Sequence, residues 1–177
     1  MTRKSMSTIG IVSVLLVLLA GTVVAAQDKY SLKTSSGIAF SDFRGYENWQ
    51  VVSLARTDEV LKAIVANPTM IDAYKAGVPG NGKPFPEGSK IAKLQWKPKK
   101  STEAPFVVDV PDTFSQAFLM EKDSKRFPNS GGWGYALFNY EAASDKFTAD
   151  PSPSDCGHAC HVAVKAKDHI FHPYQKR

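Results

Sequence analysis

Six residues near the C-terminus carry the clearest chemistry of this 177-residue chain. The stretch Cys156-Gly-His-Ala-Cys160-His161 contains both cysteines of the sequence, and a histidine directly follows the second one. Two thiols ahead of a histidine are typical of c-type haem attachment, in which the thiols bond to the haem vinyl groups and the histidine binds iron. The motif therefore predicts one covalent haem c, attached through Cys156 and Cys160, with His161 as the iron ligand.

The spacing of the two cysteines departs from the usual c-type motif, because three residues separate them instead of two. We expect Gly157 to let the extra residue bulge, since glycine tolerates unusual backbone conformations. Two other interpretations use the same residues. One is a disulfide, which is common in exported proteins but leaves the adjacent His161 unexplained. The other is a haem-free zinc or iron site that includes His158.

Residues 1–26 have the composition of a secretory signal peptide. Arg3 and Lys4 precede a nearly continuous apolar run over residues 9–24, and two alanines then precede Gln27. We expect cleavage before Gln27 and export to the periplasm, outside the cytoplasmic membrane, where haem of this type is attached. The alternative is a membrane anchor that is retained.

The mature chain has little net charge. The formal charge of the whole sequence is +5, and removal of the two basic residues of the leader leaves +3. Two haem propionates would bring this value close to zero, so the composition gives no reason to expect a nucleic-acid partner. We also expect no stable membrane insertion after cleavage.

Residues 46–177 are interpreted as a single haem domain of the α+β class, mainly antiparallel β-sheet with a few short helices. Short turns between successive strands favour antiparallel pairing. The segments 49–54 and 60–66 are apolar but fit either a strand or a helix. Apolar alternation and turn signals predict strands over residues 90–97, 106–110, 113–121 and 132–140.

Three segments outside these strands also have a predicted conformation. Asn67 and Pro68 are the residue types of a helix start, and Gly77 is typical of a helix end. Residues 27–45 are polar and are interpreted as a flexible lead-in. Residues 150–155 are predicted to form a loop that delivers the cysteine motif to the domain.

The sixth position of the iron separates electron transfer from ligand chemistry. Met70 and Met120 are the candidate sulfur ligands, but methionine on an apolar face is more often a core residue. A five-coordinate iron with one open side is therefore favoured. His158 is interpreted as an exposed residue and not as a second ligand, and His169 and His172 as surface residues or as partners of a haem propionate.

Several motifs in combination resemble the cytochrome P-460 family, and they follow the family's order over residues 46–174. They are Phe85-Pro-Glu-Gly88, Ile91-Ala-Lys-Leu-Gln-Trp96, Lys122-Asp-Ser-Lys-Arg-Phe127, Gly131-Gly-Trp-Gly134 and the end of the chain from Cys160 to Phe171. The resemblance implies a mainly antiparallel β fold and one c-type haem bound through a proximal histidine. It also implies a protein that binds or oxidises small nitrogen species, such as hydroxylamine or nitric oxide.

Two residues decide which members of the family the chain resembles more. Members with the unusual absorption carry a lysine bonded to the porphyrin edge, and Lys93 matches the place of that lysine. Phe118 stands where the hydroxylamine-oxidising members are expected to have a carboxylate, and a phenyl ring cannot accept a proton. Phe118 instead resembles the apolar distal pocket of the related c′-beta cytochromes, which bind small gases.

The resemblance leaves three functions open. The leading one is an exported mono-haem oxidoreductase that acts on hydroxylamine and passes electrons to a redox partner protein. The alternatives are a non-enzymatic gas-binding protein and a simple electron-transfer cytochrome. Because the family often forms dimers, a second copy of the chain is a further expected partner.

Overall fold

The structure is a computed structural model that describes residues 27–175, and for residues 153–156 it describes the backbone alone. The predicted signal peptide, residues 1–26, lies outside the described residues, so export stays a prediction. Within the part of the chain that is described, no helix is long and apolar enough to cross a membrane.

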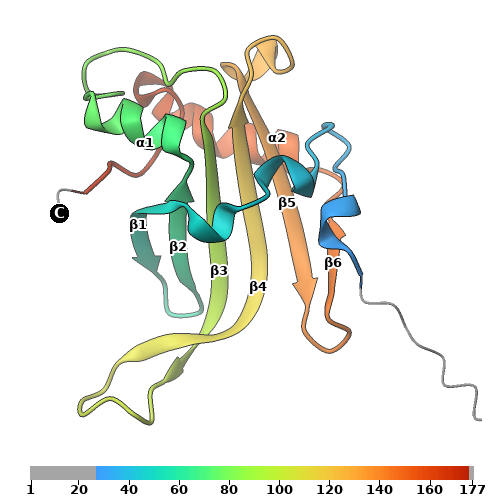
Figure 1. Cartoon of the computed structure of the whole chain (residues 1–177), viewed down its shortest axis with the longest axis vertical. Coiled ribbons are helices and arrows are strands. Elements are labelled where there is room, and N and C mark those ends of the chain that lie inside the picture. Colours follow the sequence, from blue (N-terminus) through green and yellow to red (C-terminus); the bar gives the residue numbers. More distant parts are fainter. Residues whose placement is uncertain (1–26, 176–177) are drawn as a thin grey trace, which may run out of the picture.

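Six strands form one antiparallel sheet, in which each strand pairs with the next one along the chain (Figure 1). This arrangement confirms the predicted α+β class, with a mainly antiparallel sheet and a few short helices. The two ambiguous segments, 49–54 and 60–66, both contribute strands. The six strands are β1 (Gln50–Arg56), β2 (Leu61–Ala66), β3 (Lys90–Lys100), β4 (Asp109–Lys122), β5 (Trp133–Glu141) and β6 (Lys146–Ala149).

The first helix begins and ends as its sequence predicts. The Asn67 side chain accepts a hydrogen bond from the Met70 N–H at 3.1 Å, and Pro68 occupies the first helical position. Gly77, with φ of +93°, follows the last turn. The helices are α1 (Pro68–Lys75) and α2 (Pro153–His161), with short 3₁₀ helices η1 (Lys29–Ser31), η2 (Phe40–Phe43), η3 (Tyr46–Asn48), η4 (Pro128–Ser130) and η5 (Val162–Lys167).

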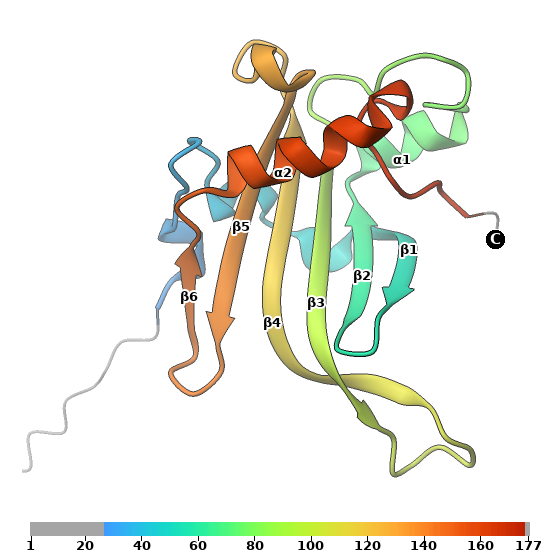
Figure 2. The ribbon, with the colours of Figure 1, turned by 180° about the vertical axis from the view of Figure 1, so that it is seen from behind.

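The sheet separates two apolar clusters. The N-terminal 3₁₀ segments cover one face, and α2 crosses the other face behind β3, β4 and β5 (Figures 1 and 2). Side chains alternate between these faces along each strand. On β3, Ala92 and Leu94 therefore pack toward the N-terminal segments, whereas Ile91 and Lys93 point to the side of α2.

Residues 27–45 pack on the sheet, which corrects the expectation of a flexible lead-in. Ile38, Phe40 and Phe43 have no exposed surface. Phe40 contacts Phe138 of β5, with 4.7 Å between the ring centroids. The polar composition of the segment did not predict the burial of these three apolar residues. Their burial offsets the entropy that is lost when the segment is ordered.

A long hairpin of β3 and β4 projects beyond the rest of the sheet (Figures 1 and 2). The predicted strand over residues 113–121 is confirmed, but the separate strand over 106–110 is wrong, because β4 begins at Asp109 and is continuous to Lys122. Pro111 lies opposite Pro98 of β3 at a point where the register shifts. Proline is tolerated at such irregular positions, so the Pro-Asp pair does not end the strand.

Candidate functional site

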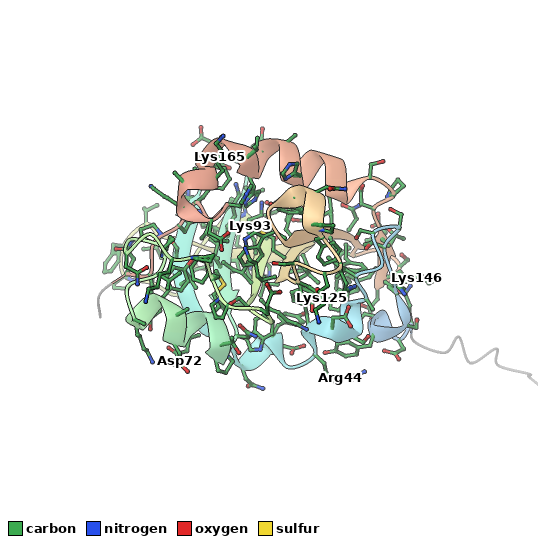
Figure 3. The ribbon with its side chains drawn as sticks, turned by 90° about the horizontal axis from the view of Figure 1, so that it is seen from above. Arg44, Asp72, Lys93, Lys125, Lys146 and Lys165 are labelled. Atoms are coloured by element: carbon green, nitrogen blue, oxygen red, sulfur yellow. The ribbon has the colours of Figure 1, made fainter. Side chains whose placement is uncertain are left out.

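The predicted site residues meet at a cavity between the sheet and the C-terminal segment. Its volume is about 650 Å³, which lies in the range of pockets for small molecules and cofactors. Lys93 and Phe118 line it from the sheet, and Cys160 and His161 line it from α2. Figure 3 looks down on this arrangement, with Lys93 between the strands and the C-terminal helix.

Helical geometry accommodates the three-residue gap between the cysteines. The prediction that residues 150–155 form a loop is only partly right, because α2 begins at Pro153 and continues through His161. Positions 156 and 160 are thus four residues apart in one helix, and positions at this spacing lie on the same helix face. The expected bulge is absent from α2, and two thiols four residues apart can serve one group.

Gly157 has a different role from the one predicted. A Cβ atom at this position would lie 2.7 Å from the Cβ atom of Tyr135. Real Cβ atoms do not approach so closely, so the glycine lets α2 lie directly against β5. This close contact sets the depth at which Cys160 and His161 enter the cavity.

His161 is oriented by a hydrogen bond to the backbone. Its Nδ1 atom lies 2.6 Å from the carbonyl oxygen of His169. Because a carbonyl only accepts, Nδ1 must carry the proton, and Nε2 keeps a free lone pair for a metal. The ring packs edge-on against Phe171 at 4.8 Å. Burial lowers the pKa of His161, which favours the neutral form that binds metals.

Lys93 and Phe118 are opposite residues of β3 and β4. The Nζ atom of Lys93 lies 3.6 Å from the centre of the Phe118 ring. Burial, together with the nearby charge of Lys62, lowers the pKa of Lys93 to about 8. A larger fraction of this amine than of an exposed lysine is therefore uncharged near neutral pH, and an uncharged amine is a nucleophile and a base.

The described lining of the cavity has few carboxylate side chains. Among its described lining residues, Asp150 is the only acidic one. Glu121 of β4 is turned away and forms ion pairs with Lys90 at 3.4 Å and with Arg126 at 2.9 Å. A carboxylate base next to Phe118 is therefore not supplied by the described part of β4.

The two candidate methionines lie in different places. Met70 is fully buried in the core around α1, and it does not line the cavity. Met120 does line the cavity, two residues after Phe118 on the same face of β4. Only Met120 could thus approach a group bound in the cavity.

Several residues of the site were not identified from the sequence. His169, expected at the surface, is buried, and its contribution to His161 is a backbone carbonyl, for which a sequence has no signal. His158 is half-buried and His172 lines the cavity. Tyr135 lines the cavity as well; its hydroxyl is buried without a hydrogen-bond partner, and burial raises its pKa.

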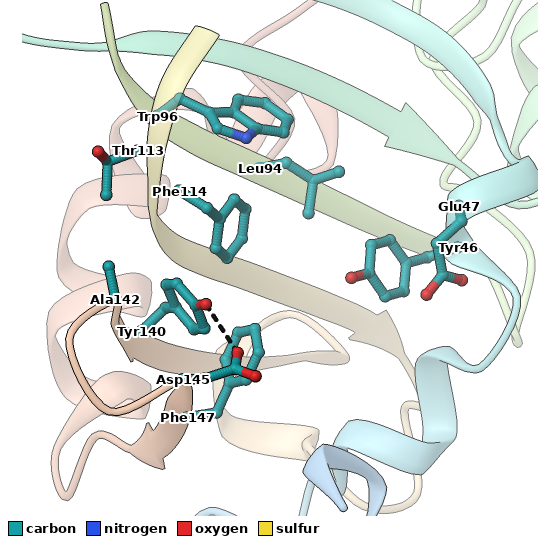
Figure 4. A pocket seen from close by; sticks show the side chains of 10 residues that line it. All are labelled: Tyr46, Glu47, Leu94, Trp96, Thr113, Phe114, Tyr140, Ala142, Asp145 and Phe147. Atoms are coloured by element: carbon teal, nitrogen blue, oxygen red, sulfur yellow. Dashed lines mark hydrogen bonds between the residues drawn. The ribbon is translucent and has the colours of Figure 1, made fainter. Parts of the chain in front are cut away.

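A second hollow lies on the opposite face of the sheet, with a volume of about 680 Å³ (Figure 4). Five of its ten lining residues are aromatic, and the Tyr140 hydroxyl donates to Asp145 at 2.8 Å. None of the residues predicted to carry chemistry lines this hollow. The cavity beside α2 is therefore the candidate functional site.

Comparison with known proteins gives one match. The family model described as Cytochrome P460 matches residues 43–172, most of the chain and all of the cavity residues named above. No curated protein matches the chain.

The lowered pKa of Lys93 predicts a pH-dependent stability. Between pH 8 and 10.5 the unfolded chain holds a proton on this amine that the folded chain has lost, so stability rises with pH in this window. From pH 8 to 10.5, we expect the free energy of unfolding of the unmodified chain to rise by roughly 1–2 kcal/mol more than that of Lys93→Met, after allowance for solvent screening. Urea denaturation in a Cys156→Ala/Cys160→Ala background, which prevents covalent haem attachment, measures it. A difference between the two proteins that is constant over this range would contradict the burial of the amine.

Proposed function

Because the chain belongs to the cytochrome P460 family, we propose that it is an exported cytochrome with one covalent haem c, which binds and oxidises small nitrogen species such as hydroxylamine. Family membership itself makes the chain a haem cytochrome. The observation that carries the more specific proposal is the position of the Lys93 amine, in the same cavity as Cys160 and His161.

The residues of the cavity fit a haem. The volume of about 650 Å³ suits a cofactor of this size, and the sheet side of the wall is mostly apolar, with Ile91, Phe118 and Leu137. His161 offers an unprotonated Nε2 atom, because its other ring nitrogen is engaged. Positions 156 and 160 share one helix face, and this histidine directly follows the second cysteine. Cys156 and Cys160 would therefore hold the haem covalently, and His161 would be its axial ligand.

A bound haem would supply an iron centre that can bind a nitrogen ligand and exchange electrons. The residues of the chain set the conditions. Phe118 makes the wall apolar and helps to exclude water. The amine of Lys93 can accept a proton near pH 8, and it could bond to the porphyrin edge if the amine and the edge carbon each gave up a hydrogen to a two-electron oxidant such as hydrogen peroxide. Both roles need the uncharged form that burial favours. Electrons from the substrate would pass to a redox partner protein, and protons would leave to solvent.

A second candidate function is non-enzymatic binding of a small gas such as nitric oxide. Phe118 favours it, because a phenyl ring cannot accept a proton and the only described carboxylate of the lining is Asp150. In this case the protein would bind the gas at the iron and would not turn over hydroxylamine.

The Lys93→Arg variant separates these functions. Arginine keeps the positive charge but cannot become neutral in a protein, so it can neither bond to the porphyrin nor act as a base. We expect hydroxylamine oxidation with an artificial electron acceptor to fall at least about 100-fold, while nitric oxide still binds. Lys62→Arg, at another lysine of the same cavity, is the matched control and should keep near-normal activity.

The optical spectrum reports on the cross-link in the same samples. A shifted Soret band in the ferrous protein that returns to the ordinary c-type position in Lys93→Arg would support the bond. An ordinary band in the unmodified protein would exclude it. A haem-loaded protein that never consumes hydroxylamine would favour the gas-binding function instead.

A homodimer is also proposed, with the β3–β4 hairpin in the contact. Phe106 and Val107 lie side by side in the hairpin loop and are 70% and 81% exposed. Adjacent apolar side chains that project from the body of a protein are typical of an interaction surface. The aromatic hollow of Figure 4 offers apolar surface that the hairpin of a second copy could cover.

Sedimentation of the mature protein tests this contact. We expect a dimer that dissociates at least about tenfold more readily in Phe106→Ser/Val107→Ser, because burial of two apolar side chains is worth a few kcal/mol. Leu54→Ser removes a similarly exposed apolar side chain from β1 and serves as the control. A wild-type protein that sediments as a monomer would contradict the proposal.

A further inference from the structure

The carbonyl that orients His161 belongs to an unusual turn. Asp168 and His169 have φ angles of +48° and +63°, in the left-handed region that residues with a side chain rarely adopt. The amides of His169 and Ile170 donate to the carbonyls of Val164 and Lys167 at 3.2 and 3.1 Å. Such a turn persists only where its surroundings hold it in place.

A buried ion pair fixes this turn to the sheet. The Nζ atom of Lys122, at the end of β4, lies 2.7 Å from Oδ1 of Asp168, and the lysine is only 5% exposed. The same Nζ donates to the carbonyl of Gly131 at 2.8 Å. The second carboxylate oxygen of Asp168 accepts the backbone N–H of Phe85 at 2.8 Å. Two segments distant in sequence thus contact Asp168, and Lys122 connects them to a third at Gly131.

The β4–β5 loop completes the enclosure. Gly131 has φ of +68°, and a Cβ atom at this position would collide with the imidazole of His169, 2.8 Å from its Cδ2 atom. The ring of His169 therefore packs against the loop that Lys122 also holds through the Gly131 carbonyl. The backbone of the turn is fixed from both sides.

Stability alone does not explain a buried ion pair at this turn. A buried ion pair loses the hydration of both charges, and well-packed apolar residues often stabilise a fold equally well. What the ion pair adds is a defined geometry, because each charged group also forms a hydrogen bond to the backbone of another segment. His169, the residue after Asp168, supplies the carbonyl that holds His161, so the ion pair fixes the position of this carbonyl.

We propose that Lys122 and Asp168 are positioning residues for the axial histidine. They hold the turn so that the His169 carbonyl accepts a hydrogen bond from the Nδ1–H group of His161. This bond directs Nε2 into the cavity and increases its basicity. The inference deepens the proposed function, because it rests on His161 as the ligand of a haem. Neither residue lines the cavity itself.

The test compares two variants of the full-length mature protein with the wild type. Asp168→Asn keeps the size and removes the charge, and Lys122→Met/Asp168→Asn removes both charges, so that no unpaired charge is buried. The control is Lys99→Met/Asp112→Asn, which removes an exposed ion pair of 3.1 Å in the hairpin. Haem content per chain is measured first in all four proteins.

Three readouts then report on the position of His161. We expect the double variant to keep its haem, to show a lower iron–histidine stretching frequency in the ferrous state and to have a higher reduction potential, because a less basic ligand donates less electron density to the iron. We expect amide exchange at His169 and Ile170 to be about tenfold faster, as for the loss of one hydrogen bond. The hairpin control should match the wild type.

A double variant with the frequency, potential and amide exchange of the wild type would overturn the proposal. Amide exchange reports on the turn even without haem. A wild-type chain without haem would therefore count against the proposed function, whereas unchanged exchange in the double variant would count against the role of Lys122 and Asp168.

Discussion

The hydrogen bond from His161 Nδ1 to the His169 carbonyl is the contact on which the site depends. It fixes the tautomer of the ring, and hence which nitrogen can bind a metal. Both partners belong to the last part of the chain, where local hydrogen bonds hold the turn and contacts with the sheet hold its position. Gly157 lets α2 rest on β5, and the Lys122–Asp168 ion pair ties the turn to β4. The sheet therefore sets the geometry of the proposed axial ligand.

The opposite wall of the cavity follows from the pleat of the same sheet. Lys93 and Phe118 face the cavity because their neighbours Ala92 and Leu119 are needed in the core on the other face. A shift of β3 by one residue would turn the amine away from the cavity. The lowered pKa of Lys93 is thus a consequence of strand register, which places a lysine where few polar groups can solvate its charge.

Local patterns were sufficient to predict some of this architecture. Alternation along β3 places Lys93 on the face opposite Leu94, and the Asn67 cap marks the start of α1. Contacts between distant segments were not predictable. The sequence at the start of α2, from Pro153, resembles that of a loop, because the helix is stabilised by packing on the sheet and not by helix propensity. Asp168 and its partner are 46 residues apart, so no local pattern relates them.

The central claim is that this cavity holds one haem bound covalently through the helix α2. Mass spectrometry of the purified mature protein under denaturing conditions tests it most directly. We expect a chain that begins at Gln27 and is heavier by one haem, with the added mass on the peptide that contains Cys156 and Cys160. A chain without added mass, in which both thiols react with an alkylating reagent, would contradict the account.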